Sequence, residues 1–185
     1  MILPNGKYII RCFVGDTDKL WFISGLPKEM MEMRFPPLAV ALRIRRETMG
    51  KKKIKERDLP EECFIELINR PADETTLLRQ VATGLYAAVD RELTFLRRTR
   101  EVSEQDEVIS FFVRPNQIGR IGKDAEFELF ARTGNKADGG LAIRSVGKER
   151  FVGVSGINFL HPIVEDISRA SLFKFESRFG SFIIK

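Results

Sequence analysis

The sequence predicts an all-β protein in which three similar units close into one barrel-like core. A block at residues 141–156, LAIRSVGKERFVGVSG, has the same order of residue types as a segment 65 residues upstream. Apolar and polar residues alternate through most of these segments, which is typical of half-buried strands. A chain of 185 residues is long enough for a single domain with a substantial core. These observations favour a closed, three-fold arrangement of sheet hairpins.

The repeated block joins an apolar-Arg-x-apolar strand to a partner strand that carries an aromatic residue. Residues 143–154 match residues 78–89 at a constant offset, so that Arg144 corresponds to Arg79. In the first copy, residues 10–13 match at an offset of 68, whereas Trp21 takes the position of Tyr86 at an offset of 65. The turn between the two strands has therefore changed length, as turns often do.

Flanking segments extend the match over the whole chain. Residues 65–70 match residues 127–132, and we expect residues 181–184 to be their third counterpart. Residues 109–114 match residues 173–178, and residues 40–45 fit the same positions. We therefore divide the single domain into units 1–70, 71–133 and 134–185.

Turn residues divide each unit into short strands. Asn5-Gly6 precedes the first strand, Pro36-Pro37 precedes a cleanly alternating one, and Pro115-Asn116 forms a turn in the second unit. In the third unit, residues 133–140 are a Gly-rich loop, and His161 lies at a turn before Pro162. We expect strands at 7–14, 20–24, 38–46, 63–69, 77–81, 85–89, 108–114, 126–132, 141–146 and 150–155.

Residues 73–100 allow a second interpretation, because an apolar stripe at helical spacing follows Asp73, a helix-capping residue type. The stripe consists of Leu78, Val81, Leu85, Val89, Leu93 and Leu96. The alternative fold is therefore α+β with one long helix at about 73–100. Gly84 and the match to the Gly-containing block at 141–156 favour strands instead.

Composition limits the class of protein and its partners. Hydrophobic residues make up 43% and charged residues 31%, as in ordinary soluble proteins. The sequence lacks the pattern of a signal peptide and any run long enough to span a bilayer, so we expect an intracellular, soluble protein. Cys12 and Cys63 are expected to be buried free thiols, since two cysteines make no disulfide framework. The net charge of +5 favours acidic partners.

The clearest candidate binding feature is a run of basic residues, which we expect at the tip of a long hairpin. Lysine clusters of this kind contact phosphates and also keep exposed edges from pairing. Residues 119–123, GRIGK, are a turn rather than a phosphate loop, because Asp124 and a strand follow. We expect no catalytic residues, metal ligands or cofactors, because the only histidine has no nucleophile or ligand pattern around it. The candidate residues for an acidic partner are Lys51, Lys52, Lys53, Lys55, Arg57, Arg97, Arg98 and Arg100.

Taken together, these units resemble a β-trefoil and are loosely similar to the trefoils of fascin-like actin cross-linkers and plant agglutinins. Residues 83–89, TGLYAAV, and 148–154, KERFVGV, take the place of that family's Gly-Lys-Tyr-Leu strand. The resemblance covers the whole chain but rests on the degenerate core pattern of a fold. The Gln-x-Trp motif of ricin-type sugar binding is absent, since Lys19-Leu20 precede Trp21, the only tryptophan.

The resemblance implies a module that holds binding loops on a rigid barrel, which leaves three hypotheses. A non-catalytic binding or scaffold module would engage a protein partner through loops 26–37, 47–61 and 115–124. A nucleic-acid-binding protein would use the basic residues at 51–57, and its affinity would fall with salt. A carbohydrate-binding lectin would bind glycans without them. We rank these hypotheses in that order.

Overall fold

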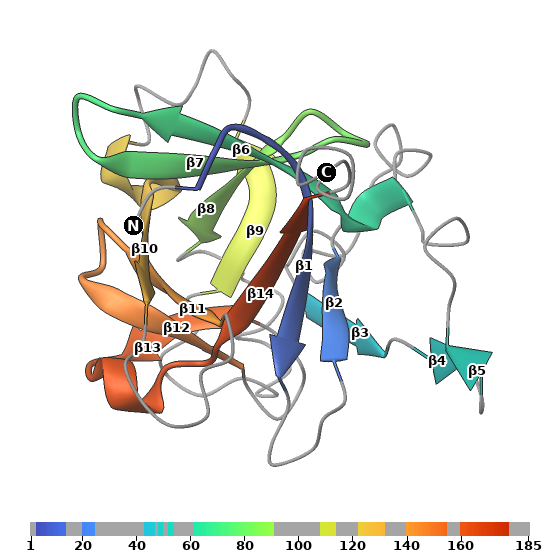
Figure 1. Ribbon diagram of the computed structural model, residues 1–185. Coiled ribbons are helices and arrows are strands. Elements are labelled where there is room, and N and C mark those ends of the chain that lie inside the picture. Colours follow the sequence, from blue (N-terminus) through green and yellow to red (C-terminus); the bar gives the residue numbers. More distant parts are fainter. Residues whose placement is uncertain are drawn as a thin grey trace, which may run out of the picture.

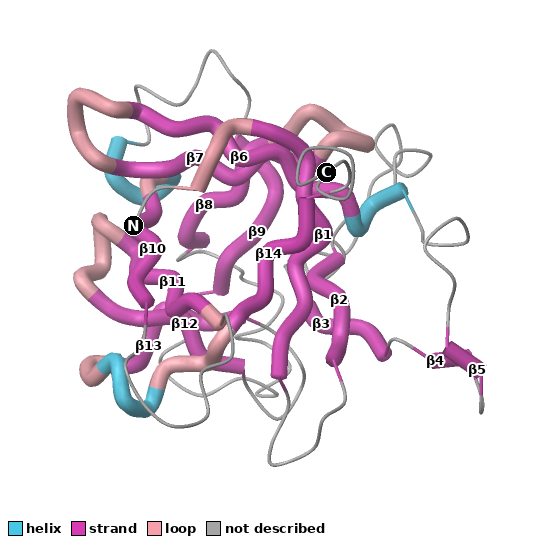
Figure 2. The backbone as a smooth tube through the Cα atoms, in the orientation of Figure 1, coloured by secondary structure: helices cyan, strands magenta, loops and turns pink. Residues whose placement is uncertain are grey.

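The chain folds into β-strands joined by turns, as the all-β prediction requires (Figure 1). The computed structural model describes residues 3–13, 20–24, 43–46, 48–49, 52–53, 61–90, 108–113, 122–131, 140–154 and 160–177. In these residues helical structure is limited to the short 3-10 turns η4 (Glu61–Cys63), η6 (Gly122–Ala125) and η7 (Ile167–Arg169) (Figure 2). The strands are β1 (Gly6–Phe13), β2 (Leu20–Ser24), β3 (Arg43–Arg46), β4 (Thr48–Met49), β5 (Lys52–Lys53), β6 (Phe64–Arg70), β7 (Thr75–Gln80), β8 (Tyr86–Asp90), β9 (Val108–Val113), β10 (Phe127–Ala131), β11 (Leu141–Ser145), β12 (Arg150–Val154), β13 (Leu160–Val164) and β14 (Phe173–Ser177).

Six of these strands form a closed ring. In order around the ring they are β1, β6, β7, β10, β11 and β14, and β14 pairs again with β1. The remaining strands of the large sheet are the hairpins β2–β3, β8–β9 and β12–β13, each attached to a ring strand. A six-stranded ring with three such hairpins is the architecture of a β-trefoil, and closure leaves the ring without free edges.

The pairing registers repeat three times around the ring. Each ring strand, the hairpin attached to it and the next ring strand along the chain form one set: β1, β2, β3 and β6; β7 to β10; and β11 to β14. The first strand of each set pairs with the last strand of the neighbouring set, and the equivalent pairs are Ile10 with Phe175, Leu78 with Leu67, and Ile143 with Leu129. The pairs between the first and last strands of the same set also correspond: Tyr8 with Ile65, Thr76 with Phe127, and Leu141 with Phe173. The three-fold prediction from the sequence is thus confirmed at the level of strand register. The unit boundaries 1–70, 71–133 and 134–185 stay a prediction.

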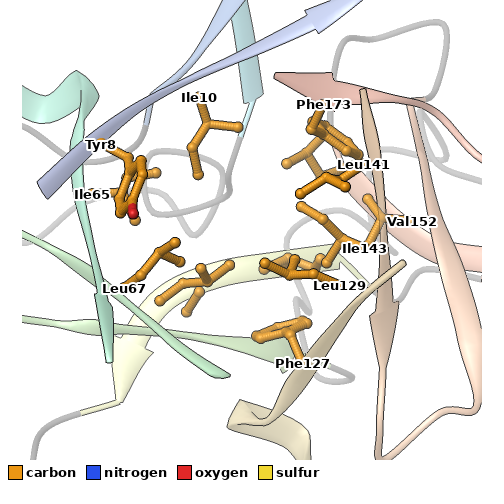
Figure 3. Packing of buried hydrophobic residues seen from close by; sticks show 14 of the residues in the cluster. Tyr8, Ile10, Ile65, Leu67, Phe127, Leu129, Leu141, Ile143, Val152 and Phe173 are labelled. Carbon is orange, nitrogen blue, oxygen red and sulfur yellow. The ribbon is translucent and has the colours of Figure 1, made fainter. Parts of the chain in front are cut away.

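The inward positions of the ring make one hydrophobic core. Phe127, Phe173 and Ile65 are fully buried and lie in one cluster with Ile10 and Leu67 (Figure 3). Burying each such side chain contributes about 1.5–3 kcal/mol before entropy is counted. The equivalent positions therefore hold apolar residues for the same reason in each set: they are the residues that point into the closed ring.

Three details of the sequence prediction are wrong. The alternative helix at 73–100 is absent over residues 73–90, which form β7, a turn and β8; residues 91–100 lie outside the described residues. The third counterpart of β6 and β10 is β14, since it takes their place in the ring, so neither the match of 181–184 to 65–70 nor that of 173–178 to 109–114 holds. His161 is a buried residue of strand β13 rather than a turn residue.

These errors have physical causes. Gly84 ends the turn between β7 and β8 with a φ of 71°, a conformation that glycine adopts freely and that a helix does not contain. Pro162 fits in β13 because, among the described strands, β13 ends the path of paired strands and pairs only with β12. Local patterns of apolar residues carry no information on either point.

Candidate functional site

Three rows of side-chain positions cross the outside of the barrel at equivalent places. Each row runs from a ring strand that ends a set, through its ring neighbour, to the attached hairpin, and alternates with the core positions on those strands. Row 1 consists of Lys174, Arg11, Phe22 and Arg45; row 2 of Glu66, Arg79, Tyr86 and Val113; and row 3 of Glu128, Arg144, Phe151 and Val164. In every row an arginine pairs in register with an aromatic residue.

Rows 2 and 3 balance their charge internally. Arg79 Nη1 donates to Glu66 Oε2 at 3.1 Å, and Arg144 Nη1 lies 3.6 Å from Glu128 Oε1. In each case the carboxylate stands directly opposite the arginine in the strand register. The last position of both rows, on the second strand of the hairpin, is a valine. These rows are cross-strand ion pairs next to an aromatic residue, and such partly exposed pairs each contribute at most about 1 kcal/mol.

Row 1 differs from the other two at both ends. Lys174 replaces the glutamate opposite Arg11, and Arg45 replaces the valine opposite Phe22. The carboxylate of Glu176 interacts with both Arg11 and Lys174. Glu176 Oε1 lies 3.4 Å from Arg11 Nη1 and 3.6 Å from Lys174 Nζ. Arg11 is largely buried, whereas the side chain of Lys174 is 44% exposed. Row 1 therefore keeps a net positive charge that its two counterparts lack.

The strand that ends row 1, β3, and the hairpin that follows it in the chain are also rich in basic residues. β3 contains Arg43, Arg45 and Arg46, and β5 consists of Lys52 and Lys53. β4 and β5 pair with each other as a two-stranded sheet separate from the large one, and in Figure 1 this hairpin lies beyond β3, away from the ring. Residues 43–57 hold eight basic and two acidic residues, a net charge of +6, whereas the whole chain carries +5. The excess positive charge of the chain is thus confined to this segment.

The basic residues predicted from sequence are only partly placed. Lys52 and Lys53 form β5, where they pair with Met49 and Thr48. The others lie outside the described residues: Lys51, Lys55, Arg57, Arg97, Arg98 and Arg100. Lys174, Arg11 and the arginines of β3 were not predicted from the sequence as members of a basic surface. The repeat alignment contained the signal for Arg11, because it placed this arginine with Arg79 and Arg144, but it gave no strand partner for it.

The same registers correct one residue of the repeat alignment. Phe22, not Trp21, pairs with Arg11 as Tyr86 pairs with Arg79 and Phe151 with Arg144. The aromatic position of the first copy is therefore displaced by one residue. Because successive strand residues face opposite sides of a sheet, this displacement assigns Trp21 to the face of the buried residue Cys12.

Other reactive groups belong to the interior. Cys12 and Cys63 are buried, as predicted, and are not joined in a disulfide. Burial raises the pKa of the Cys12 thiol to about 12. Burial also raises the pKa of Tyr8, whose hydroxyl donates to the carbonyl of Pro4 at 2.7 Å. Within the described ranges, no three residues of the types His, Cys, Asp and Glu are grouped as metal ligands would be. In the same part of the chain, no helix has the length and apolar character needed to cross a membrane.

Comparison with known proteins identifies the fold. No family model and no curated protein matches this chain. A solved structure titled "BEL beta-trefoil apo crystal form 3" is similar, with 12% identity and a TM-score of 0.55 over 95% of this chain and 96% of that one. A mosquitocidal holotoxin is similar over 95% of this chain at 9% identity and a TM-score of 0.56, but the match covers only 18% of the toxin chain. At these identities the likeness shows the β-trefoil fold and nothing about activity.

Proposed function

We propose that this protein is a non-catalytic binding module for an acidic macromolecule, with the segment 43–57 as its main contact surface. The observation that carries the proposal is the location of the charge: residues 43–57 carry a net charge of +6, and this segment includes β3, at the end of the path of paired strands, and the hairpin β4–β5. A concentrated field of one sign raises the local concentration and the association rate of oppositely charged partners.

The architecture supports this proposal. The closed ring and its core supply a rigid support, whereas β4 and β5 take no part in the large sheet. A two-stranded hairpin is only marginally stable by itself, so a contact between its lysine-rich strand and an acidic partner would stabilise it. Of the three loops proposed for a protein partner, 47–61 contains this hairpin, and 26–37 lies outside the described residues. Of loop 115–124, the structure describes residues 122–124, which belong to η6.

The proposal is tested by retention on a polyanion. The variant Lys51→Glu/Lys52→Glu/Lys53→Glu and the unaltered protein would be applied to heparin-agarose and eluted with a salt gradient. A matched control, Lys7→Glu/Lys123→Glu/Arg169→Glu, changes the net charge equally at exposed positions elsewhere. We expect the first variant to elute well before the unaltered protein and the control to elute close to it. Equal elution of the two variants would refute the proposal, because retention would then reflect net charge alone.

A further inference from the structure

Residues 3–5, which we call the N-terminal arm, are tied to strand β6 of the ring. Asn69 N–H donates to Asn5 Oδ1 at 2.8 Å, and the side-chain amide of Asn69 donates to the carbonyl of Leu3. Leu3 also packs against the main hydrophobic core. Terminal segments are ordered where such contacts tie them down, so the position of the arm depends on the contact between Asn5 and Asn69.

The ring holds the other side of this contact in place. Thr76, a buried residue of β7, donates its hydroxyl to Asn69 Oδ1 at 2.8 Å. This bond orients the side-chain amide of Asn69, whose nitrogen then donates to the arm. Asn5 lies at the exposed end of the network, where solvent reaches its side chain.

Asn5 is followed by a glycine, and this pair of residues occurs once in the chain. In an Asn-Gly pair the backbone nitrogen of the glycine can attack the side-chain Cγ of the asparagine, because glycine has no Cβ to obstruct the approach. Gly6 has a φ of 153°, and a Cβ there would meet only Tyr8 Cε2, at 3.9 Å. The backbone thus favours glycine at residue 6, and the side of the peptide where a Cβ would lie is uncrowded.

We propose that Asn5 is a site of spontaneous deamidation, and that this modification releases the N-terminal arm from β6. The nitrogen of Gly6 loses its proton and forms a bond to Asn5 Cγ, the side-chain amide leaves as ammonia, and a cyclic imide results. Water then opens the imide at one of its two carbonyls and gives aspartate or isoaspartate. One water is consumed and one ammonia is released, and no oxidant or reductant takes part.

The network supplies a donor for this step. As Gly6 nitrogen adds to Cγ, negative charge develops on Asn5 Oδ1, the oxygen that already accepts from Asn69 N–H at 2.8 Å. A fixed backbone N–H at this distance stabilises such a charge, as donors do in oxyanion holes. The folded protein therefore holds in place a group that the unfolded chain lacks.

The two products have different effects on the arm. Aspartate leaves the main chain unchanged, and its carboxylate still accepts from Asn69 N–H. Isoaspartate carries the main chain through the former side chain, which adds one methylene between residues 5 and 6. The oxygen that accepted from Asn69 then belongs to the main chain, so the arm loses its register with β6.

The test ages the purified protein at neutral pH and physiological temperature, once folded and once in urea. Peptide mapping by mass spectrometry locates the mass gain of about one dalton, and an isoaspartyl methyltransferase assay measures isoaspartate. The other asparagines are internal controls in the same sample: Asn69, Asn116, Asn135 and Asn158. The variant Asn5→Ser cannot form the imide at this position, and Asn5→Asp carries the aspartate product from the start. Asn5→Gln replaces Asn5→Ser if circular dichroism shows that Asn5→Ser does not fold.

We expect Asn5 to convert before the other four asparagines, and to convert no more slowly in the folded protein than in urea. The melting temperature of the aged protein should fall by about 2–4 °C, the shift expected for one lost hydrogen bond in a chain of this size. Asn5→Ser should keep its own melting temperature on ageing, and Asn5→Asp should melt close to the unaltered protein.

Three results would overturn the inference. Earlier conversion of another asparagine, or faster conversion of Asn5 in urea, would show that the network protects Asn5. An isoaspartate-containing protein that melts like the fresh protein would show that the arm does not depend on Asn5. An equal fall in melting temperature on ageing of Asn5→Ser would place the damage elsewhere in the chain.

Discussion

Equivalent turns in the second and third sets of strands make a reciprocal prediction about stability. Gly84 N–H donates to the carbonyl of Gln80 at 2.8 Å, and Glu149 N–H donates to the carbonyl of Ser145 at 2.9 Å. Both donors have a positive φ, 71° for Gly84 and 55° for Glu149. The turns are thus the same, but only one has the residue suited to this conformation. We expect Glu149→Gly to stabilise the protein and Gly84→Ala to destabilise it.

The magnitudes follow from the backbone. A non-glycine residue in the left-handed region destabilises the folded state by about 1–2 kcal/mol. Replacing it with glycine removes this strain, but the greater entropy of the unfolded chain offsets roughly 0.5–1 kcal/mol of the gain. Glu149→Gly should therefore add about 0.5–1 kcal/mol to the free energy of unfolding. A Cβ at residue 84 would lie 3.5 Å from Arg79 Nη2, an ordinary contact, so Gly84→Ala costs only the backbone strain, about 1 kcal/mol.

Urea denaturation followed by circular dichroism measures these differences, and thermal melting should shift by about 2–4 °C per kcal/mol for a chain of this size. Lys148→Gly is the control, because Lys148, next to Glu149, does not have a positive φ. This change should lower the free energy of unfolding by about 0.5–1 kcal/mol. A decrease in stability for Glu149→Gly, or no change for Gly84→Ala, would show that the two turns are not equivalent.

Three further predictions concern the core and the turn between β11 and β12. Phe173→Ala should lower the free energy of unfolding by about 3–5 kcal/mol in urea titrations, because this fully buried residue lies on the strand that closes the ring; a loss under 1 kcal/mol would argue against closure. Gly147→Ala should destabilise by more than 1 kcal/mol in the same assay, since a Cβ there would lie 2.7 Å from Asp124 Oδ1 and 3.1 Å from the backbone of Lys123. Burial raises the pKa of Cys12 from 9.0 to about 12, so its stabilising effect is complete below pH 9 and is lost as pH rises towards 12; Cys12→Ala should reduce the fall in stability over that range, and an unchanged pH profile would contradict the assignment.

The sequence by itself determined the fold class and most strand positions. The repeat at 78–89 and 143–154 placed β7, β8, β11 and β12 correctly, because inward positions of a three-fold barrel face the same core and so keep the same residue types. The outer rows were partly visible for the same reason, since Arg11, Arg79 and Arg144 aligned. The strands β2 and β9 were also predicted to within one residue from alternation and turn residues alone.

Only the tertiary structure decided which residues meet across strands. Arg11 stands opposite Lys174, 163 residues away in the chain, and Arg79 stands opposite Glu66, 13 residues away, although the two arginines look alike in the sequence. Ring closure brings β14 against β1, and strand alternation then fixes which side chains share the outer face. A one-residue displacement, as at Trp21 and Phe22, exchanges the core face for the outer face, and no local pattern reveals it. The excess charge of row 1 is therefore a property of strand pairing, which the order of residues along the chain does not contain.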